Sequence, residues 1–144
     1  MEEYVNNGPL KIVIVEDNVA LAEIYKTRLD IIGYECHVAY DGQAALSLIE
    51  RVKPALVLLD LMMPVISGDE VLRRMRATDW GKDIRVYIIS NLNEVDAPKD
   101  LRELGIEGYT VKANLSDDDI DKLVDKILTP KDQEESTSLE EPAV

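Results

Sequence analysis

Several side chains capable of chemistry each follow a short apolar stretch of the sequence. They are Glu16, Asp17, Asp60, Ser90 and Lys112. Parallel strands in an open α/β sheet deliver the residues at their carboxyl ends to one rim, where ligands usually bind. A single carboxylate beside a loop can also be a plain hydrogen-bond acceptor in a turn. These residues therefore indicate a site only as a group.

The acidic residues predict a cation site if they lie together. Two unit charges about 4 Å apart repel by roughly 4 kcal/mol at an effective dielectric constant near 20. A cluster of Glu16, Asp17 and Asp60 must therefore hold either a proton or a cation. Oxygen ligands with open positions for water and phosphate suit Mg²⁺. With the ammonium of Lys112 and the hydroxyl of Ser90, such a cluster could support phosphoryl transfer onto an aspartate.

Asp60 ends a fully apolar stretch. Residues 55–59 read as a strand that is buried on both faces. Pro64 and Gly68 prevent a strand or a helix from continuing, and a new helix opens near Asp69. The pattern places Asp60 at the end of a central strand, next to a loop.

Strands and helices are predicted to alternate along the chain. We expect strands at residues 11–15, 35–40, 55–59, 84–89 and 108–111. We expect helices between Asn18 and Gly33, after the Asp41-Gly42 turn and before Pro54, from near Asp69 to Trp80, within residues 92–105 and from Ser116 to Leu128. The fourth helix should be short or begin late, because proline at position 98 fits only a first helical turn. Five strands alternating with five helices predict an α/β fold with a doubly wound parallel sheet.

Two elements carry expectations about which face is buried. Residues 35–40 alternate like an edge strand, with Cys36, Val38 and Tyr40 on one face and Glu35, His37 and Ala39 on a wetter face. In the first helix, the apolar positions at helical spacing are Leu21, Ile24, Tyr25, Leu29 and Ile32. We expect these positions to face the core.

Length and composition indicate one domain in a cytoplasmic protein. The chain has 144 residues, of which 46% are hydrophobic and 31% charged. A single cysteine excludes an intramolecular disulfide, and no apolar run approaches the roughly 20 residues of a membrane span. The net charge of −13 argues against nonspecific binding to nucleic acid, and we expect no direct nucleic-acid partner. We expect a lead-in at residues 1–9, a domain at 10–129 and an acidic, mobile tail at 130–144.

The motifs together resemble a known family, the receiver domain of two-component response regulators. The resemblance covers about residues 10–128 and rests on Glu16-Asp17, Asp60-Leu-Met-Met-Pro64, Gly68, Ser90, Tyr109 and Lys112, in the family's order and at its spacings. It implies a flavodoxin-like fold with strand order 2-1-3-4-5. It also implies a phosphorylation-activated response regulator in a two-component system or phosphorelay.

The resemblance implies a role for each matching residue. Asp60 would accept a phosphoryl group from the phosphohistidine of a sensor histidine kinase or a histidine phosphotransfer protein. Asp17 and Asp60 would bind Mg²⁺ directly, Glu16 would bind it through water, and Met62 would offer its backbone carbonyl. Lys112 would pair with the phosphoryl oxygens. Ser90 and Tyr109 would act as switch residues. Their movement would shift the surface of the fourth helix, fifth strand and fifth helix for an output protein or onward transfer.

Departures from the family pattern leave alternatives open. Asn91 replaces a usually small residue, and Ala113 replaces a proline whose preceding peptide bond is typically cis, so we predict a trans bond there. Met62 and Leu92 have no group able to orient an attacking water, which predicts a long-lived phosphoryl-aspartate.

Two alternative functions follow from these departures and from Asp60 itself. One is a pseudo-receiver that acts only as a protein-interaction module. The other is an aspartate-nucleophile phosphohydrolase, which would typically need a second aspartate where Met62 stands. On the leading interpretation the protein is no enzyme in the ordinary sense, since it catalyses only its own phosphorylation and dephosphorylation.

Overall fold

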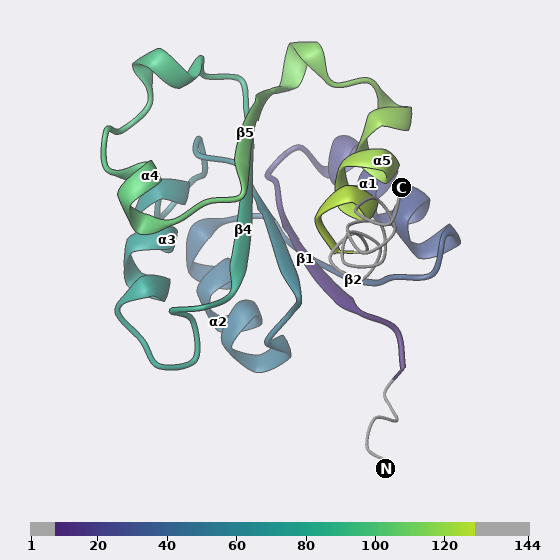
Figure 1. The fold of residues 1–144 in the computed structure, drawn as a ribbon, viewed down its shortest axis with the longest axis horizontal. Helices are drawn as coiled ribbons and strands as arrows, with labels where there is room; N and C mark the ends of the chain where they lie inside the picture. The colour runs from purple at the N-terminus through teal and green to yellow at the C-terminus, as the bar shows by residue number, and fades with distance from the viewer. Residues whose placement is uncertain (1–7, 129–144) are drawn as a thin grey trace, which may run out of the picture.

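A five-stranded parallel sheet runs through the centre of the protein (Figure 1). The computed structural model describes residues 8–128, so most of the predicted lead-in and the whole predicted tail lie outside the described residues. The strands are β1 (Lys11–Val15), β2 (Glu35–Ala39), β3 (Leu56–Leu59), β4 (Arg85–Ser90) and β5 (Gly108–Val111). Their order is β2-β1-β3-β4-β5, which confirms the predicted doubly wound topology.

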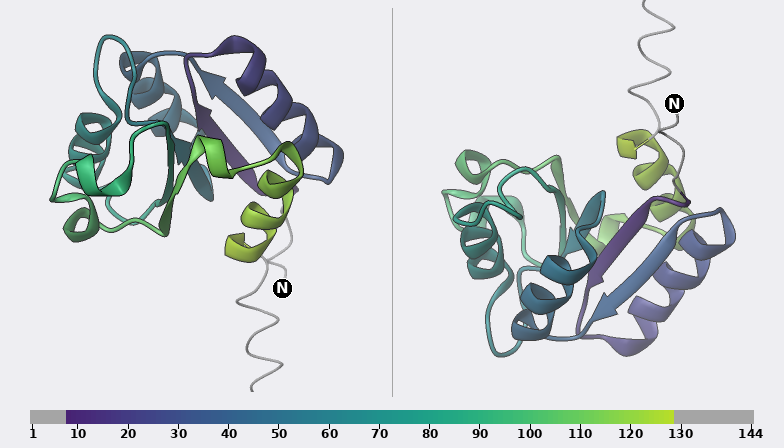
Figure 2. Two further views of the ribbon diagram at one scale, coloured as in Figure 1. Left: turned by 90° about the horizontal axis from the view of Figure 1, so that it is seen from above. Right: turned by 90° about the horizontal axis from the view of Figure 1, so that it is seen from below.

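Helices cover both faces of the sheet (Figures 1 and 2). They are α1 (Val19–Ile31), α2 (Gly42–Val52), α3 (Gly68–Arg76), α4 (Leu101–Leu104) and α5 (Asp117–Leu128), with short 3-10 turns η1 (Glu94–Asp96) and η2 (Lys112–Asn114). One face packs against α1 and α5, and the other packs against α2, α3 and α4. No helix in the described range is long and apolar enough to cross a membrane.

Alternating side chains of the central strands fill the two cores. In β1, Ile12 and Ile14 pack on the α1–α5 side, whereas Val13 and Val15 pack on the opposite side. Successive residues of a strand point to opposite faces, so a strand covered on both sides must be apolar throughout. This explains why β3 and residues 12–15 of β1 are continuous apolar runs, each followed by an acidic residue.

Two predictions of buried faces were partly wrong. Ile24 of α1 and Ile32, which directly follows α1, are exposed at 38% and 43%, and Ala22 is fully buried in their place. In β2, Ala39 is buried and the strand ends there, so Tyr40 lies outside it and is 39% exposed. Both errors have one cause, because the packing neighbour decides which of several apolar residues is covered.

The third helix ends four residues earlier than Trp80, where it was expected to close. Its last residue is Arg76. The hydroxyl of Thr78 donates to the carbonyl of Met75 at 2.8 Å and accepts from the amide of Gly81 at 2.9 Å. These local bonds give the backbone an alternative to further helix.

Arginines of α3 hold the short α4 in place. Arg73 forms a bidentate pair with Asp100, with N–O distances of 2.8 and 3.1 Å. Arg76 donates to the carbonyls of Leu104 and Gly105 at 2.7 and 2.8 Å, which supplies partners for the end of α4. The brevity of α4 confirms the prediction from proline at position 98, whereas these long-range contacts were not predicted.

Candidate functional site

The strand register brings the predicted carboxylates to one rim of the sheet. Val15 of β1 pairs with Leu59 of β3. Glu16 and Asp60 are the next residues after these two strands, so they lie beside each other at the same end of the sheet. The Asp60 amide donates to the Val15 carbonyl at 3.1 Å, which extends the pairing by one residue. Glu16 and Asp60 are only 2% and 4% exposed, unusual burial for acidic side chains.

The acidic cluster consists of Glu16, Asp17 and Asp60. Each offers a carboxylate oxygen, and these oxygens lie within 4.8 Å of one another. Asp17 is exposed and faces solvent, whereas the other two are buried. This set of hard oxygen donors, open on one side, could hold a divalent cation. The arrangement is the one expected from the sequence.

Lys112 bridges the two buried carboxylates. Its Nζ lies 2.8 Å from Oε1 of Glu16 and 2.8 Å from Oδ2 of Asp60, and its side chain is 13% exposed. Burial lowers the Lys112 pKa, but the hydrogen bonds to Asp60 and Glu16 outweigh burial and raise it. Burial raises the pKa of Glu16, because its bonds to Lys112 and to the Asn18 amide offset only part of the desolvation. Lys112 therefore stays cationic and neutralises part of the cluster.

The loop after β3 packs closely against Asp60, through the Met62 amide and the backbone of Gly68. Oδ1 of Asp60 accepts a hydrogen bond from the Met62 amide at 3.1 Å. A Cβ atom at Gly68 would lie 2.1 Å from the Asp60 carbonyl oxygen, so only glycine fits there. Val65 has a φ of 71°, which is strained for a β-branched residue. The loop thus holds an unusual backbone shape directly beside the carboxylate.

We expect Gly68→Ala to destabilise the protein and to displace Asp60. The added methyl group would clash with backbone atoms that cannot move freely, and this should lower the free energy of unfolding by about 1–3 kcal/mol or more. Urea unfolding would measure the loss. Ser67→Ala is the matched control, because Ser67 makes no side-chain cap bond and its loss should change stability by about 0.5 kcal/mol or less. Equal stabilities of the two variants would contradict the close approach.

The proposed switch residues are linked through the β4–η1 loop. Ser90 is fully buried, and its hydroxyl accepts from the Leu92 amide at 3.3 Å. The Tyr109 hydroxyl donates to the Leu92 carbonyl at 2.6 Å. Burial is the main cause that raises the Tyr109 pKa. Leu92 therefore connects the two residues, a contact that the sequence did not predict.

The peptide bond between Lys112 and Ala113 is trans, as predicted. None of the peptide bonds among residues 8–128 is cis. The chain enters η2 at once, and the Leu115 amide donates to the Lys112 carbonyl at 3.0 Å. Lys112 still reaches both carboxylates without a proline after it.

Tyr25 is a site neighbour that sequence reasoning placed only in the core. It is 4% exposed and lines a space of about 10 Å³ together with Glu16 and Asp60. Burial, followed by the charge of Glu16, raises its pKa to about 12, so it stays protonated. A hydroxyl among the aliphatic positions of α1 was the available signal.

Comparison with known proteins gives one consistent result. A family model for the response regulator receiver domain matches residues 12–126. The chain is 38% identical over 102 residues to "probable transcriptional regulator ycf27" of Porphyridium aerugineum, which covers 71% of this chain and 41% of that protein. The chain spans about two fifths of the length of the curated relatives that it matches first.

Solved structures share the fold. The receiver domain of the Francisella response regulator 1452 has a TM-score of 0.71 and 27% identity, and the match covers 81% of this chain and 93% of that chain. The phosphorylated cyanobacterial phytochrome response regulator RcpA has a TM-score of 0.71 and 26% identity, with coverages of 83% and 91%.

Proposed function

The chain belongs to the response regulator receiver domain family, and we propose from this premise that Asp60 accepts a phosphoryl group. The observation that carries the proposal is the position of Lys112, which contacts Glu16 and Asp60 at 2.8 Å each. A cation held between a buried carboxylate and its neighbour is suited to neutralising an incoming phosphoryl group. The protein would be a phosphorylation-activated response regulator of a two-component system or phosphorelay.

The donor is a phosphohistidine of a sensor histidine kinase or a phosphotransfer protein. A carboxylate oxygen of Asp60 forms the new O–P bond as the P–N bond to the donor imidazole breaks, and the imidazole keeps the electron pair of that bond and takes up a proton. Lys112 pairs with the phosphoryl oxygens, and Ser90 offers its hydroxyl. Because the chain acts on its own aspartate, we propose that it catalyses only its own phosphorylation and dephosphorylation.

The acidic cluster fits Mg²⁺: Asp17 and Asp60 would bind the ion directly, Glu16 would act through water, and the Met62 backbone carbonyl would complete the protein ligands. When bound, the ion neutralises charge on the carboxylates and on the phosphoryl oxygens. Asp17 supports this assignment because it is the exposed member of the cluster and leaves its outer side open.

We expect Mg²⁺ to raise the unfolding temperature, because the three carboxylates converge only in the folded chain. Thermal unfolding with and without Mg²⁺ measures the shift, and Asp17→Asn should remove most of it. Asp79→Asn is the control, since Asp79 is fully exposed and its one ion pair within residues 8–128 is with Lys82, at 4.0 Å. A shift that survives Asp17→Asn would contradict the assignment of Asp17 as a ligand.

Phosphorylation would act on the surface formed by α4, β5 and α5. Tyr109 lies on β5 and contacts Leu92 in the loop that follows Ser90. A shift of Ser90 toward the phosphoryl group would therefore reach that surface through Leu92. The output protein that reads this change, or the carrier that receives the phosphoryl group onward, would bind there in the cytoplasm. Neither nucleic acid nor a membrane is a proposed direct partner.

We expect a long-lived phosphoryl-aspartate. Met62 is 56% exposed beside the site, and neither its thioether nor the Leu92 side chain can position an attacking water. The decay of the adduct by intact mass measures the lifetime, and Met62→Asn should shorten it. A wild-type half-life of seconds would contradict this prediction.

Intact mass after incubation with Mg²⁺ and acetyl phosphate tests the proposed function directly. A gain of one phosphoryl group supports it. If the chain binds neither Mg²⁺ nor a phosphoryl group, the pseudo-receiver becomes the better interpretation. Release of free phosphate from phosphoesters would support the phosphohydrolase instead, although Met62 cannot serve as its general acid.

A further inference from the structure

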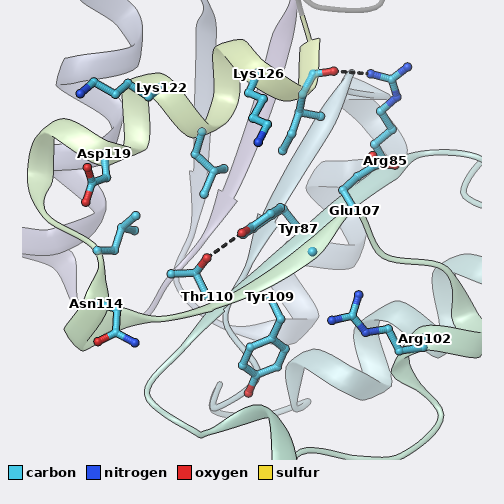
Figure 3. Close-up of a pocket in the computed structure, with 14 residues that line it drawn as sticks. Arg85, Tyr87, Arg102, Glu107, Tyr109, Thr110, Asn114, Asp119, Lys122 and Lys126 are labelled. Carbon is cyan, nitrogen blue, oxygen red and sulfur yellow. Dashed lines mark hydrogen bonds between the residues drawn. The ribbon is translucent and has the colours of Figure 1, made fainter.

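An open groove lies between β5 and α5, away from the acidic cluster (Figure 3). Its volume is about 920 Å³. Its walls include Arg85, Tyr87, Thr110, Lys122 and Lys126, and we call it the β5–α5 groove. The ring of Tyr87 forms part of it, fixed by a hydrogen bond of 2.6 Å between the hydroxyls of Tyr87 and Thr110.

The α5 side of the groove is basic, although the chain carries a net charge of −13. Lys122 and Lys126 are one helical turn apart and exposed, and neither forms an ion pair with any residue among 8–128. Figure 3 shows the amino group of Lys126 directed toward Tyr87. Two acidic residues, Glu107 and Asp119, also line the groove, but Asp119 is engaged by the Ser116 amide at 2.8 Å. The exposed lysines thus offer positive charge to an acidic ligand.

Helix α5 lines this groove, and an acidic segment follows α5 in the sequence. Arg85, at one end of the groove, donates to the Ile127 carbonyl at 2.9 Å and lines a second hollow together with Leu128. Residues 130–144 follow, with five carboxylates against one lysine. Six extended residues beyond Leu128 reach Glu134 and span up to about 20 Å, more than the roughly 6 Å between Lys122 and Lys126 along α5.

We propose that the acidic segment 130–144 binds in the β5–α5 groove of its own chain, with its carboxylates beside Lys122 and Lys126. The groove overlaps the surface proposed to bind an output protein, so the segment would compete with that partner. Only this consequence rests on the proposed function. The contact itself requires neither phosphorylation nor Mg²⁺.

Carbodiimide cross-linking of the full, unphosphorylated chain in metal-free buffer tests the contact. This reagent joins amines to carboxylates that already touch, and mass spectrometry identifies the pairs. We expect Lys122 and Lys126 to form cross-links to Asp132, Glu134 or Glu135 several-fold more often than Lys82 does. Lys82 is the matched control because its side chain is 58% exposed and lies outside the groove. The excess should fall as salt is raised, because screening weakens exposed charge pairs.

A second measurement does not depend on cross-linking. Amide hydrogen exchange of residues 108–111 should become several-fold faster in the double variant Lys122→Glu, Lys126→Glu, and should not change in Lys82→Glu. The proposal would be overturned if Lys122 and Lys126 form cross-links to the segment no more often than Lys82 does and if the amide exchange of residues 108–111 is unchanged in the double variant. A mixture of ¹⁴N- and ¹⁵N-labelled protein identifies cross-links between copies. If only those form, the proposal is also overturned, and the groove binds the segment of a second molecule.

Discussion

Asp60→Asn is expected to abolish the phosphoryl adduct that forms with acetyl phosphate and Mg²⁺. The asparagine amide keeps the shape of the carboxylate and its acceptor for the Met62 amide, but it lacks a nucleophilic oxygen. It also removes one of the two carboxylates that Lys112 contacts, so the change acts on the bond-forming atom and on the charge around it. Intact mass should show complete loss, not a slower reaction.

The controls separate chemistry from folding. Asp79→Asn should be phosphorylated like the wild type, since Asp79 is a fully exposed acid outside the acidic cluster. Thermal unfolding should show that Asp60→Asn is folded. An adduct that persists in Asp60→Asn would place the acceptor elsewhere, and peptide mapping would locate it.

Lys112→Met is expected to cost about 3–5 kcal/mol of unfolding free energy at pH 7, because it leaves buried carboxylates without their partner. The side chains of Glu16 and Asp60 are only 3% and 4% exposed, so water cannot replace the lysine. Methionine has a similar length and fills the same space without the charge. Urea unfolding measures the loss.

The unfolding free energy lost in Lys112→Met should become smaller as the pH falls. Burial already raises the pKa of Glu16 above its ordinary 4.5, and removal of the Lys112 hydrogen bond raises it further. A group whose folded pKa is raised contributes stability that is present below the unfolded pKa and is lost as the pH rises through the folded pKa. The deficit of Lys112→Met is therefore greatest above the raised pKa and shrinks as the pH falls toward 4.5.

Two variants check the origin of this loss. The double variant Glu16→Gln, Lys112→Met should recover part of the stability at pH 7, since one buried charge is gone. Lys82→Met, at a largely exposed lysine, should change stability by about 0.5 kcal/mol or less. A deficit that is the same at pH 5 and pH 7 would show that lost packing, and not charge, is the cause.

The sequence by itself determined the strands and their alternation with helices, whereas their order, now shown by the structure, was implied by the family resemblance. Residues 11–15 and 108–111 were predicted as strands with the bounds that the structure shows. Both are short β-rich stretches that end at a polar residue, and this signal is local. Parallel strands place their carboxyl ends at one rim, so Glu16 and Asp60 were expected to meet before any contact was known.

Only the tertiary structure decided which groups touch. The sequence could not show that Ala22 is buried and Ile24 is exposed, because the neighbouring elements choose the covered face of α1. It could not show that Arg76 caps an α4 carbonyl 28 residues away. Periodicity and propensity are read within a few residues of the chain, whereas these contacts join segments that only folding brings together.

The same division holds within the site. Asp60, Glu16 and Lys112 were recognisable one by one, but the two contacts of 2.8 Å from Lys112 and the burial that makes them matter come from packing. Desolvation turns an ordinary lysine and two ordinary carboxylates into a group with strongly coupled charges. The sequence therefore identified the site residues, whereas the fold determined how strongly their charges interact.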